Sequence, residues 1–232
     1  MNVLLALGCL LAVLLGVAGI LLRDAVRSRS LQRRASALGF SFEPVSDQAT
    51  GPQLKNSSCL QDGCSTVAFN VLTGEAGGFQ VRIFDLRDES LETPALTTVA
   101  AFRSQSALPA FELGLQGLFG RVAEALKARP AGGKENLAKQ FLIGGATNER
   151  RVGEFLTAPR LERLRLSMNQ YRITCNPEWV FVYRPGVRIK ARGFTHFLEE
   201  TTRIAEALLK CASNSQKSAP SKGLSVSRSA GA

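Results

Sequence analysis

The longest hydrophobic pattern in the chain is an apolar run at its N-terminal end. Residues 3 to 22 carry no charged side chain and are rich in Leu, Val, Ala and Gly. A helix rises about 1.5 Å per residue, so this run covers roughly 30 Å, the thickness of the hydrocarbon core of a bilayer. The pattern predicts a transmembrane anchor over residues 1 to 22, with the lipid bilayer as its partner through residues 3 to 22.

Two other interpretations of this run are weaker. A signal peptide normally begins with a basic side chain, whereas Met1 and Asn2 have none, and no convincing small-x-small cleavage site follows. Ala6-Leu7-Gly8-Cys9 is similar to a lipoprotein cleavage box, but Leu7 stands where a small residue is expected. Lipidation of Cys9 is therefore an alternative to an ordinary helix position.

Arginines follow the apolar run at once. The chain has Arg23, Arg27, Arg29, Arg33 and Arg34 here, whereas the N-terminal side offers the terminal amine alone. The positive-inside rule therefore places the N-terminus outside and the C-terminal bulk in the cytoplasm. Residues 23 to 38 are expected to form a basic juxtamembrane helix that Gly39 ends. Its five arginines are candidates for contact with anionic lipid head groups; a topology signal on a solvated helix face is the alternative.

Shorter, strand-like patterns occupy most of the chain that follows. Alternating or β-branched segments lie at 40–42, 66–72, 79–87, 95–103, 110–116, 141–143, 171–175 and 179–183. Pro44 is expected to stop the first, an edge strand, before a polar loop over 45–64. The four strands between 66 and 116 have short connections, including a glycine-rich one at 73–78, so they predict an antiparallel meander.

Helical spacing appears at 118–126, again from a cap at Thr147 or Asn148, again from Pro159, and finally over 195–211. The last helix is expected to bury Phe197, Leu198, Ile204, Leu208 and Leu209. This order predicts an α+β fold: an N-terminal transmembrane helix followed, over residues 39 to 211, by antiparallel sheet with packed helices. Residues 212 to 232 contain seven Ser among positions 213 to 232 and are expected to be a disordered tail.

Composition and charge narrow the possible partners. A chain of 232 residues with 45% hydrophobic content suits one substantial core. The net charge of +10 comes largely from residues 23 to 34 and from the tail, which leaves +3 for residues 35 to 211. No nucleic-acid partner is expected from so balanced a domain. The five cysteines are an odd number and form no disulfide framework.

Motifs for phosphate or metal binding are incomplete. Gly133-Lys134 lacks the earlier glycine and the following Ser or Thr of a phosphate-binding loop. Gly144-Gly145 ends a strand before a helix start, where backbone N–H groups can hold an anion, although such turns are common without a ligand. Cys59 and Cys64 are candidate zinc ligands that Cys175 or His196 would have to complete. The alternative is that they are loop thiols.

The titratable residues form no recognisable catalytic set. His196 is the single histidine and is interpreted as a residue of a helix-cap region. Asp85 and Asp88 flank Arg87, and Glu199-Glu200 lie on the last helix, without the arrangement of a general acid and base. A basic loop contains Arg184, Arg188, Lys190 and Arg192, which can touch phosphates or a membrane surface; a solvated loop is the alternative interpretation.

Four short motifs connect this chain to other proteins. They are Gly39-Phe40-Ser41-Phe42, Phe84-Asp85-Leu86-Arg87, Leu108-Pro109-Ala110-Phe111-Glu112-Leu113 and Val182-Tyr183-Arg184-Pro185-Gly186. With the apolar run and the arginine-rich junction, they resemble a family of uncharacterised bacterial single-pass membrane proteins. The resemblance implies placement in the bacterial inner (plasma) membrane and supplies no catalytic residue.

The sequence thus favours a membrane-tethered, non-catalytic interaction module with a protein partner that it does not name, and no cofactor. One alternative is an enzyme or small-ligand-binding domain whose site, with Asp85, His196 or the Gly144-Gly145 turn, forms only in three dimensions. Another is thiolate metal binding at Cys59 and Cys64.

Overall fold

The computed structural model describes residues 2–45, 66–88, 95–115, 129–130, 141–146, 148–168 and 170–216. Within the first helix, the side chains described are those of residues 7–11, 14–16, 18, 19 and 22–37. The helices are α1 (Asn2–Ala37), α4 (Glu149–Phe155), α5 (Ala158–Met168), the 3-10 helix η3 (Ala191–Gly193) and α6 (Phe194–Gln216). The strands are β1 (Ser41–Val45), β2 (Thr66–Ala76), β3 (Phe79–Asp88), β4 (Ala95–Arg103), β5 (Phe111–Leu115), β6 (Arg129–Pro130), β7 (Phe141–Gly144), β8 (Arg172–Cys175) and β9 (Trp179–Tyr183).

Among the described residues, nine strands form one sheet in the order β1-β2-β3-β4-β9-β8-β5-β7-β6, and every paired neighbour is antiparallel. The predicted meander is right from β2 to β4 and wrong for β5, because the hairpin of β8 and β9 lies between β4 and β5. Strands β4 and β5 are neighbours in sequence but not in the sheet. Strand β9 (Trp179–Tyr183), which is apolar and buried along its length, pairs with β4 instead.

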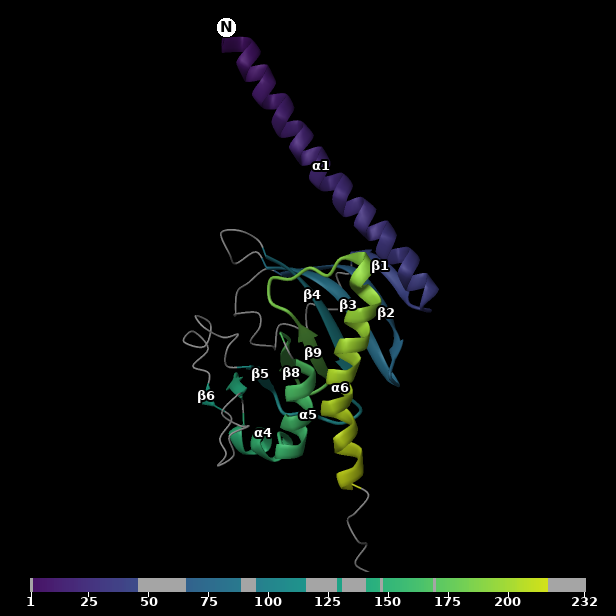
Figure 1. The fold of residues 1–232 in the computed structure, drawn as a ribbon, viewed down its shortest axis with the longest axis vertical. Helices are drawn as coiled ribbons and strands as arrows, with labels where there is room; N and C mark the ends of the chain where they lie inside the picture. The colour runs from purple at the N-terminus through teal and green to yellow at the C-terminus, as the bar shows by residue number, and fades with distance from the viewer. Residues whose placement is uncertain are drawn as a thin grey trace, which may run out of the picture.

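The sheet buries apolar residues on both faces. The larger core joins one face to α4, α5, α6 and the end of α1, and includes Ile83, Phe102, Phe111, Phe197 and Leu208. Figure 1 shows α5 and α6 side by side across this face. The second cluster, with Phe84, Val99, Trp179 and Phe181, lies on the opposite face. Alternation along β3 produces this division, since Ile83 enters one cluster and Phe84 the other.

The junction between α1 and the sheet is short and tight. Leu31 and Ala35 are buried in the larger core, and Leu38 donates its backbone N–H to the carbonyls of Arg34 and Ala35. Gly39 then adopts φ +74°, the left-handed conformation that ends helices, as its position in the sequence predicts. Phe40 packs so closely on Gly74 of β2 that a Cβ there would lie 2.7 Å from its ring.

Several predicted boundaries need correction. Pro44 lies within β1 instead of stopping it, which an edge strand tolerates because one side of its backbone needs no partner. The glycine-rich connection is shorter than predicted: Thr73 to Ala76 belong to β2, and Gly77-Gly78 make the turn with φ of +61° and +82°. Helix α6 continues to Gln216, beyond the predicted end at Cys211 and into the expected tail. Leu198 is partly buried, whereas the other four predicted core residues of α6 are buried.

The N-terminal helix is present, but the prediction that it spans a membrane is not confirmed. Helix α1 runs from Asn2 to Ala37 and projects away from the domain over its N-terminal part (Figure 1). In the described part of the chain, no helix is long and apolar enough to cross a membrane.

Four predictions concern segments that the structure does not describe. The loop over 45–64, the helix over 118–126, the Gly133-Lys134 loop and the tail beyond Gln216 lie outside the described residues, apart from Val45 in β1.

Candidate functional site

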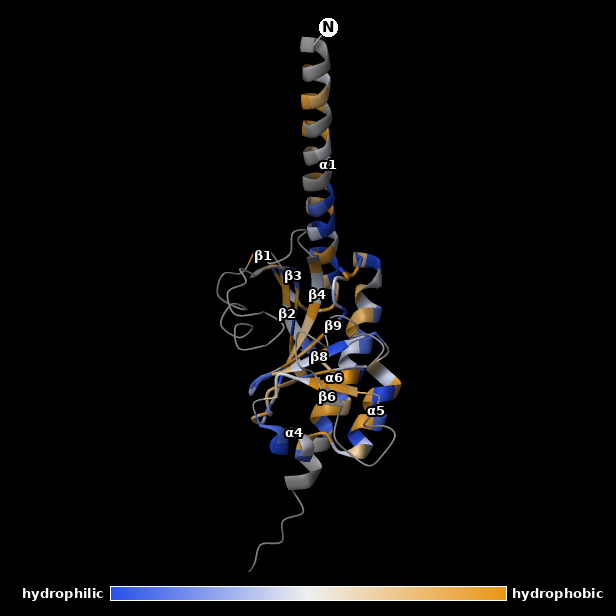
Figure 2. Cartoon of the chain, turned by 90° about the vertical axis from the view of Figure 1, so that its left-hand side faces the viewer, coloured by the Kyte–Doolittle hydropathy of each residue, from blue (hydrophilic) through white to orange (hydrophobic). Residues whose placement is uncertain are grey.

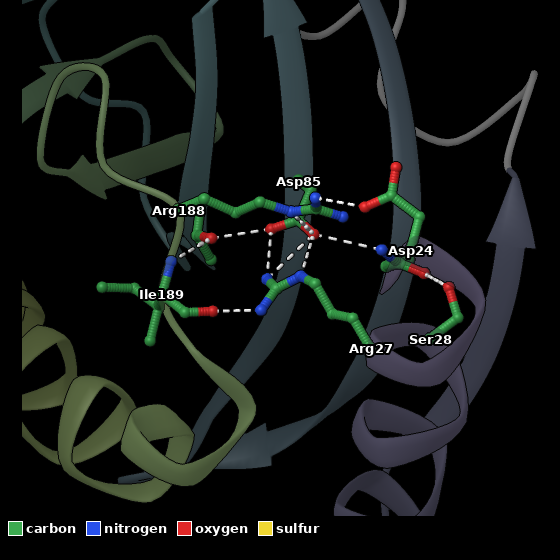
Figure 3. A network of polar contacts seen from close by, with 8 residues as sticks. Asp24, Arg27, Ser28, Asp85, Arg188 and Ile189 are labelled. Atoms are coloured by element: carbon green, nitrogen blue, oxygen red, sulfur yellow. Dashed lines mark hydrogen bonds and ion pairs between the residues drawn. The ribbon is translucent and has the colours of Figure 1, made fainter. Parts of the chain in front are cut away.

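Asp85 is the centre of the most extensive group of polar contacts that the structure describes. It lies on β3, where Val81, Ile83 and Asp85 share the face that packs on the helices. Its exposed fraction is 1%, so its charge needs partners within the protein. Asp85 and the groups linked to it directly or through one partner form what we call the Asp85 cluster: Asp24, Arg27, Ser28, Asn70, Asp85, Thr98, Arg188 and the backbone of Ile189. Figure 3 shows this network.

Two arginines from segments far apart in the sequence neutralise Asp85. Arg27 of α1 binds both carboxylate oxygens, with its Nη2 2.8 Å from Oδ1 and its Nε 3.1 Å from Oδ2. Arg188, in the segment between β9 and η3, places its Nε 3.1 Å from Oδ2. The second arginine also binds Asp24 of α1, with Nη1 2.6 Å from its carboxylate. Two acids and two bases therefore balance in charge.

Neutral groups complete the contacts of Asp85. Thr98 of β4 donates to Oδ1 at 2.6 Å, and its hydroxyl accepts the backbone N–H of Ile189 at 2.9 Å. Arg27 also donates to the carbonyl of Ile189. The segment after β9 is thus held to β4 and to α1 by the same few atoms.

Asn70 reaches Asp85 because β2 contains a bulge. The register moves from Phe69 opposite Asp85 to Leu72 opposite Ile83, which inserts one extra residue. Asn70 adopts φ +52°, a left-handed conformation that Asn tolerates better than most residues. Its side chain donates to Asp85 at 3.1 Å and accepts from Ser28 of α1. The bulge therefore contributes a third connection between the sheet and α1.

This geometry makes Asp85 unsuitable as a general base. Oδ1 accepts hydrogen bonds from Arg27 and Thr98, and Oδ2 accepts them from Arg27, Asn70 and Arg188. A base needs a free lone pair within reach of a substrate proton. The gap beside Asp85, lined also by Leu31, Ile83 and Phe194, has no room for a water-sized molecule. Asp85 therefore acts as a structural anion that joins α1 to the sheet.

A second group of polar contacts surrounds Glu200 on α6. Glu200 accepts a hydrogen bond from the hydroxyl of Tyr171 at 2.6 Å and one from Arg184 at 3.1 Å. His196, one turn earlier, lies 3.5 Å from its other oxygen, and Arg184 stacks on the Tyr171 ring at 4.4 Å. Burial and the hydrogen bond to Glu200 raise the pKa of Tyr171 far above its ordinary value of 10.0. We call Tyr171, Arg184, His196 and Glu200 the Glu200 cluster.

The residues proposed for a site formed in three dimensions do not come together. His196 is 72% exposed and belongs to the Glu200 cluster, not to the contacts of Asp85. The Gly144-Gly145 turn follows β7, which is five strands away from β3 in the sheet. At about 4.8 Å per strand, that is roughly 24 Å.

The predicted thiolate site has little support from the cysteines that are described. Cys59, Cys64 and the side chain of Cys211 lie outside the described residues. Cys175 is buried on β8, and His196 lies on an exposed helix turn. Within the described residues, no group of three or more His, Cys, Asp or Glu side chains could hold a metal ion.

The sequence predicted two separate basic segments, the juxtamembrane helix and the loop after β9. The structure brings one arginine from each of them to Asp85. Arg27 and Arg188 look equivalent to their neighbours in the sequence, yet they turn inward to Asp85, with 13% and 19% of their side chains exposed. Arg23, Arg29 and Arg33 on α1 are exposed, as are Lys190 and Arg192. The available signal was the position of Asp85, which follows Val81 and Ile83 on the alternating face of β3 that enters the core, because a buried carboxylate needs cations nearby.

Comparison with known proteins supports the fold and goes no further. No family model and no curated protein matches this sequence. The crystal structure of the mycobacterial trehalose monomycolate transport factor A, TtfA, is similar, with a TM-score of 0.51 and 18% sequence identity over 78% of this chain and 95% of that chain. The chain therefore has an α+β fold with an antiparallel sheet and packed helices, as predicted. The resemblance to uncharacterised bacterial membrane proteins stays a prediction.

Proposed function

We propose that this chain is a membrane-tethered, non-catalytic interaction module, in which α1 anchors the domain and the Asp85 cluster fixes its orientation. The observation that carries the proposal is the difference between the two halves of α1. The half that contacts the domain is basic and binds it through ion pairs, whereas the other half is apolar and projects from it.

The projecting half has a surface suited to lipid. Large apolar side chains are 57% to 65% exposed at Leu7, Leu10, Leu11, Leu14 and Leu15. In Figure 2 the described residues of this half include hydrophobic ones in orange, and hydrophilic blue begins where the helix reaches the domain. An exposed apolar patch of this size marks a surface that something else covers. Because residues 3 to 22 also lack a charge over roughly 30 Å, a bilayer fits it.

The orientation that we propose rests on charge. The exposed arginines Arg23, Arg29 and Arg33 follow the apolar run, and basic residues favour the cytoplasmic side. The domain therefore lies in the cytoplasm at the bacterial inner membrane, with the N-terminus outside. Contact of Arg23, the first of these arginines after the apolar run, with anionic lipid is part of the same proposal.

The fold similarity supplies one named role for comparison. A protein with a similar fold is named as a factor in trehalose monomycolate transport. We carry over only the named role, that of a factor in a transport process; the protein partner and the non-catalytic action in our proposal do not come from this similarity.

Membrane fractionation tests the anchor. Full-length protein is expected to stay with membranes after alkaline carbonate, whereas protein lacking residues 1 to 22 is expected in the supernatant. Leu11→Arg with Leu14→Arg should also release the chain, because each arginine costs about 2.5 to 3.5 kcal/mol near a helix centre in the membrane. Leu166→Arg on α5, where the side chain is 72% exposed, is the matched control and should not. Full-length protein in the carbonate supernatant would refute the proposal.

The orientation needs a separate experiment. In a variant that keeps buried Cys175 and has serine in place of every other cysteine, Leu166→Cys introduces an exposed thiol on the domain. A membrane-impermeant maleimide should label it only after the inner membrane is opened. Labelling once the outer layer alone is opened would place the domain on the other side.

A further inference from the structure

The Asp85 cluster fixes the position of the segment between β9 and η3 relative to α1. It holds the segment between β9 and η3 beside α1 at a definite height along the helix. Arg188 binds Asp24, and the backbone of Ile189 binds Arg27. The segment therefore lies level with residues 24 to 27 of α1.

That height is close to the proposed bilayer. Leu22 is the last residue of the uncharged run, and Asp24 and Arg27 follow it by two and five residues. At 1.5 Å per residue they lie about 3 Å and 7.5 Å beyond it along the helix axis, and an ordinary tilt of about 20° shortens this by less than a tenth. The head-group layer is roughly 5 to 7 Å thick on each side of the hydrocarbon core. The segment from Val187 to Gly193 thus sits at the outer edge of this layer.

The exposed side chains at this level are cationic. Lys190 and Arg192 are exposed, and so is Arg23, the residue before Asp24 on α1. None of the three has an ion-pair partner among the described residues, whereas Arg188 and Arg27 are neutralised by Asp24 and Asp85. The carboxylates of the Asp85 cluster thus neutralise Arg27 and Arg188. Within the described part of the chain, the exposed cations Arg23, Lys190 and Arg192 stay unneutralised near the proposed head groups.

We infer that Arg23, Lys190 and Arg192 form a lipid-contacting face that binds anionic head groups and presses this end of the domain against the membrane. The inference rests on the proposed anchor and adds a site to it. Arg33 is excluded from the face: it lies eleven residues beyond Leu22, about 16 Å along the axis and outside the head-group layer. The domain is then held to the bilayer at two places, by α1 and by the segment before α6.

Amide hydrogen exchange of the full chain in lipid nanodiscs tests this face. Discs of phosphatidylcholine are compared with discs that also contain phosphatidylglycerol. Each cation near an anionic surface contributes roughly a fivefold preference for it. Residues 187 to 193 are therefore expected to exchange at least about fivefold more slowly in the anionic discs. Free inorganic phosphate added to phosphatidylcholine discs should not reproduce the effect.

Charge-neutral variants identify the residues. Lys190→Gln with Arg192→Gln should remove most of the lipid-dependent slowing. The matched control is Arg150→Gln with Arg151→Gln, two exposed arginines on α4, which lies at the opposite end of the domain from the projecting part of α1 (Figure 1). This control and Arg33→Gln should keep the full effect. Unchanged exchange of β4 and β9 in every variant would show that the fold is intact.

The outcomes separate the two proposals. If the protein stays in the discs but residues 187 to 193 exchange equally in both lipids, the lipid-contacting face is refuted and the anchor stands. If slowing persists in the Lys190 and Arg192 variant, these side chains are not responsible and the inference is wrong. If the protein is not retained in discs at all, both proposals fail.

Discussion

The Asp85 and Glu200 clusters contain similar chemistry in different surroundings. Each has a carboxylate that accepts hydrogen bonds from arginine and from a hydroxyl group. Asp85 is 1% exposed and joins α1, β2, β3, β4 and the segment after β9. Glu200 is 23% exposed and joins α6 to the ends of β8 and β9.

Burial decides what each cluster does. A carboxylate sealed from water depends on its partners, so removing one side leaves a charge that costs several kcal/mol. A carboxylate that still reaches water can replace a lost partner with solvent, and its pairs are worth about 1 kcal/mol or less. Asp85 is therefore expected to decide whether α1 stays docked, whereas Glu200 adjusts local stability.

The largest effect is expected from Asp85→Asn. The variant keeps the shape of the side chain but leaves Arg27 and Arg188 without their shared anion, so we expect a loss of about 3 to 5 kcal/mol in the free energy of unfolding. Urea unfolding of the full chain in detergent, followed by the fluorescence of buried Trp179, measures it. Glu200→Gln is the matched comparison and should cost about 1 kcal/mol or less. Equal losses in the two variants would contradict the distinction between the clusters.

A smaller but more local effect is expected from Arg27→Met. Methionine keeps the apolar stem, and Arg188 still neutralises Asp85, so the expected loss is about 2 to 3 kcal/mol. Because Arg27 belongs to α1, amide exchange should accelerate in residues 23 to 37 more than in the sheet. Arg33→Met on the exposed side of the same helix should stay within about 0.5 kcal/mol of the parent. Acceleration confined to the sheet would mean that Arg27 does not hold the helix.

Two variants of Asn70 distinguish the contribution of its side chain to stability from that of its backbone conformation. Asn70→Gly keeps a residue that accepts φ +52° but removes the hydrogen bonds to Asp85 and Ser28, and we expect a loss of about 1 to 2 kcal/mol. Asn70→Ala should cost more, since it loses the same bonds and also strains the bulge. Both values come from the same urea titration. A glycine variant less stable than the alanine variant would overturn this account of the bulge.

The smallest effect concerns pH and Tyr171. In the native state its pKa is raised, so above about pH 10 the unfolded chain releases this proton while the folded chain keeps it. Stability from this residue is thus complete below pH 10 and falls as pH rises, by at most about 1.4 kcal/mol per pH unit. The loss in the free energy of unfolding between pH 9 and pH 10.5 should therefore be smaller in Tyr171→Phe than in the parent protein. Parallel pH profiles for the two proteins would show that Tyr171 titrates normally.

Local patterns predicted most of the described elements. The hairpin of β8 and β9, strand β4 and the helix end at Gly39 each depend on a few neighbouring residues, and each was predicted from them. The helix cap was predicted at Thr147 or Asn148, and it is Asn148. The errors arose where distant segments compete. The hairpin displaces β5 from β4, and α6 extends past Cys211 because its last turns continue a helix that is already packed.

By itself, the sequence determined most of the described elements, the fold class and the uncharged run of residues 3 to 22, because these follow from periodicity and composition along the chain. Tertiary structure alone decided which charges meet. Arg27 and Arg29 are both basic positions of one helix, and Asp85 and Asp88 are both acids near the end of one strand. A bulge at Asn70 and the return of the chain after β9 bring Arg27, Arg188 and Asp85 together, over sequence separations of 58 and 103 residues. No local pattern encodes such a meeting, since electrostatic attraction depends on distance in space and on burial from water.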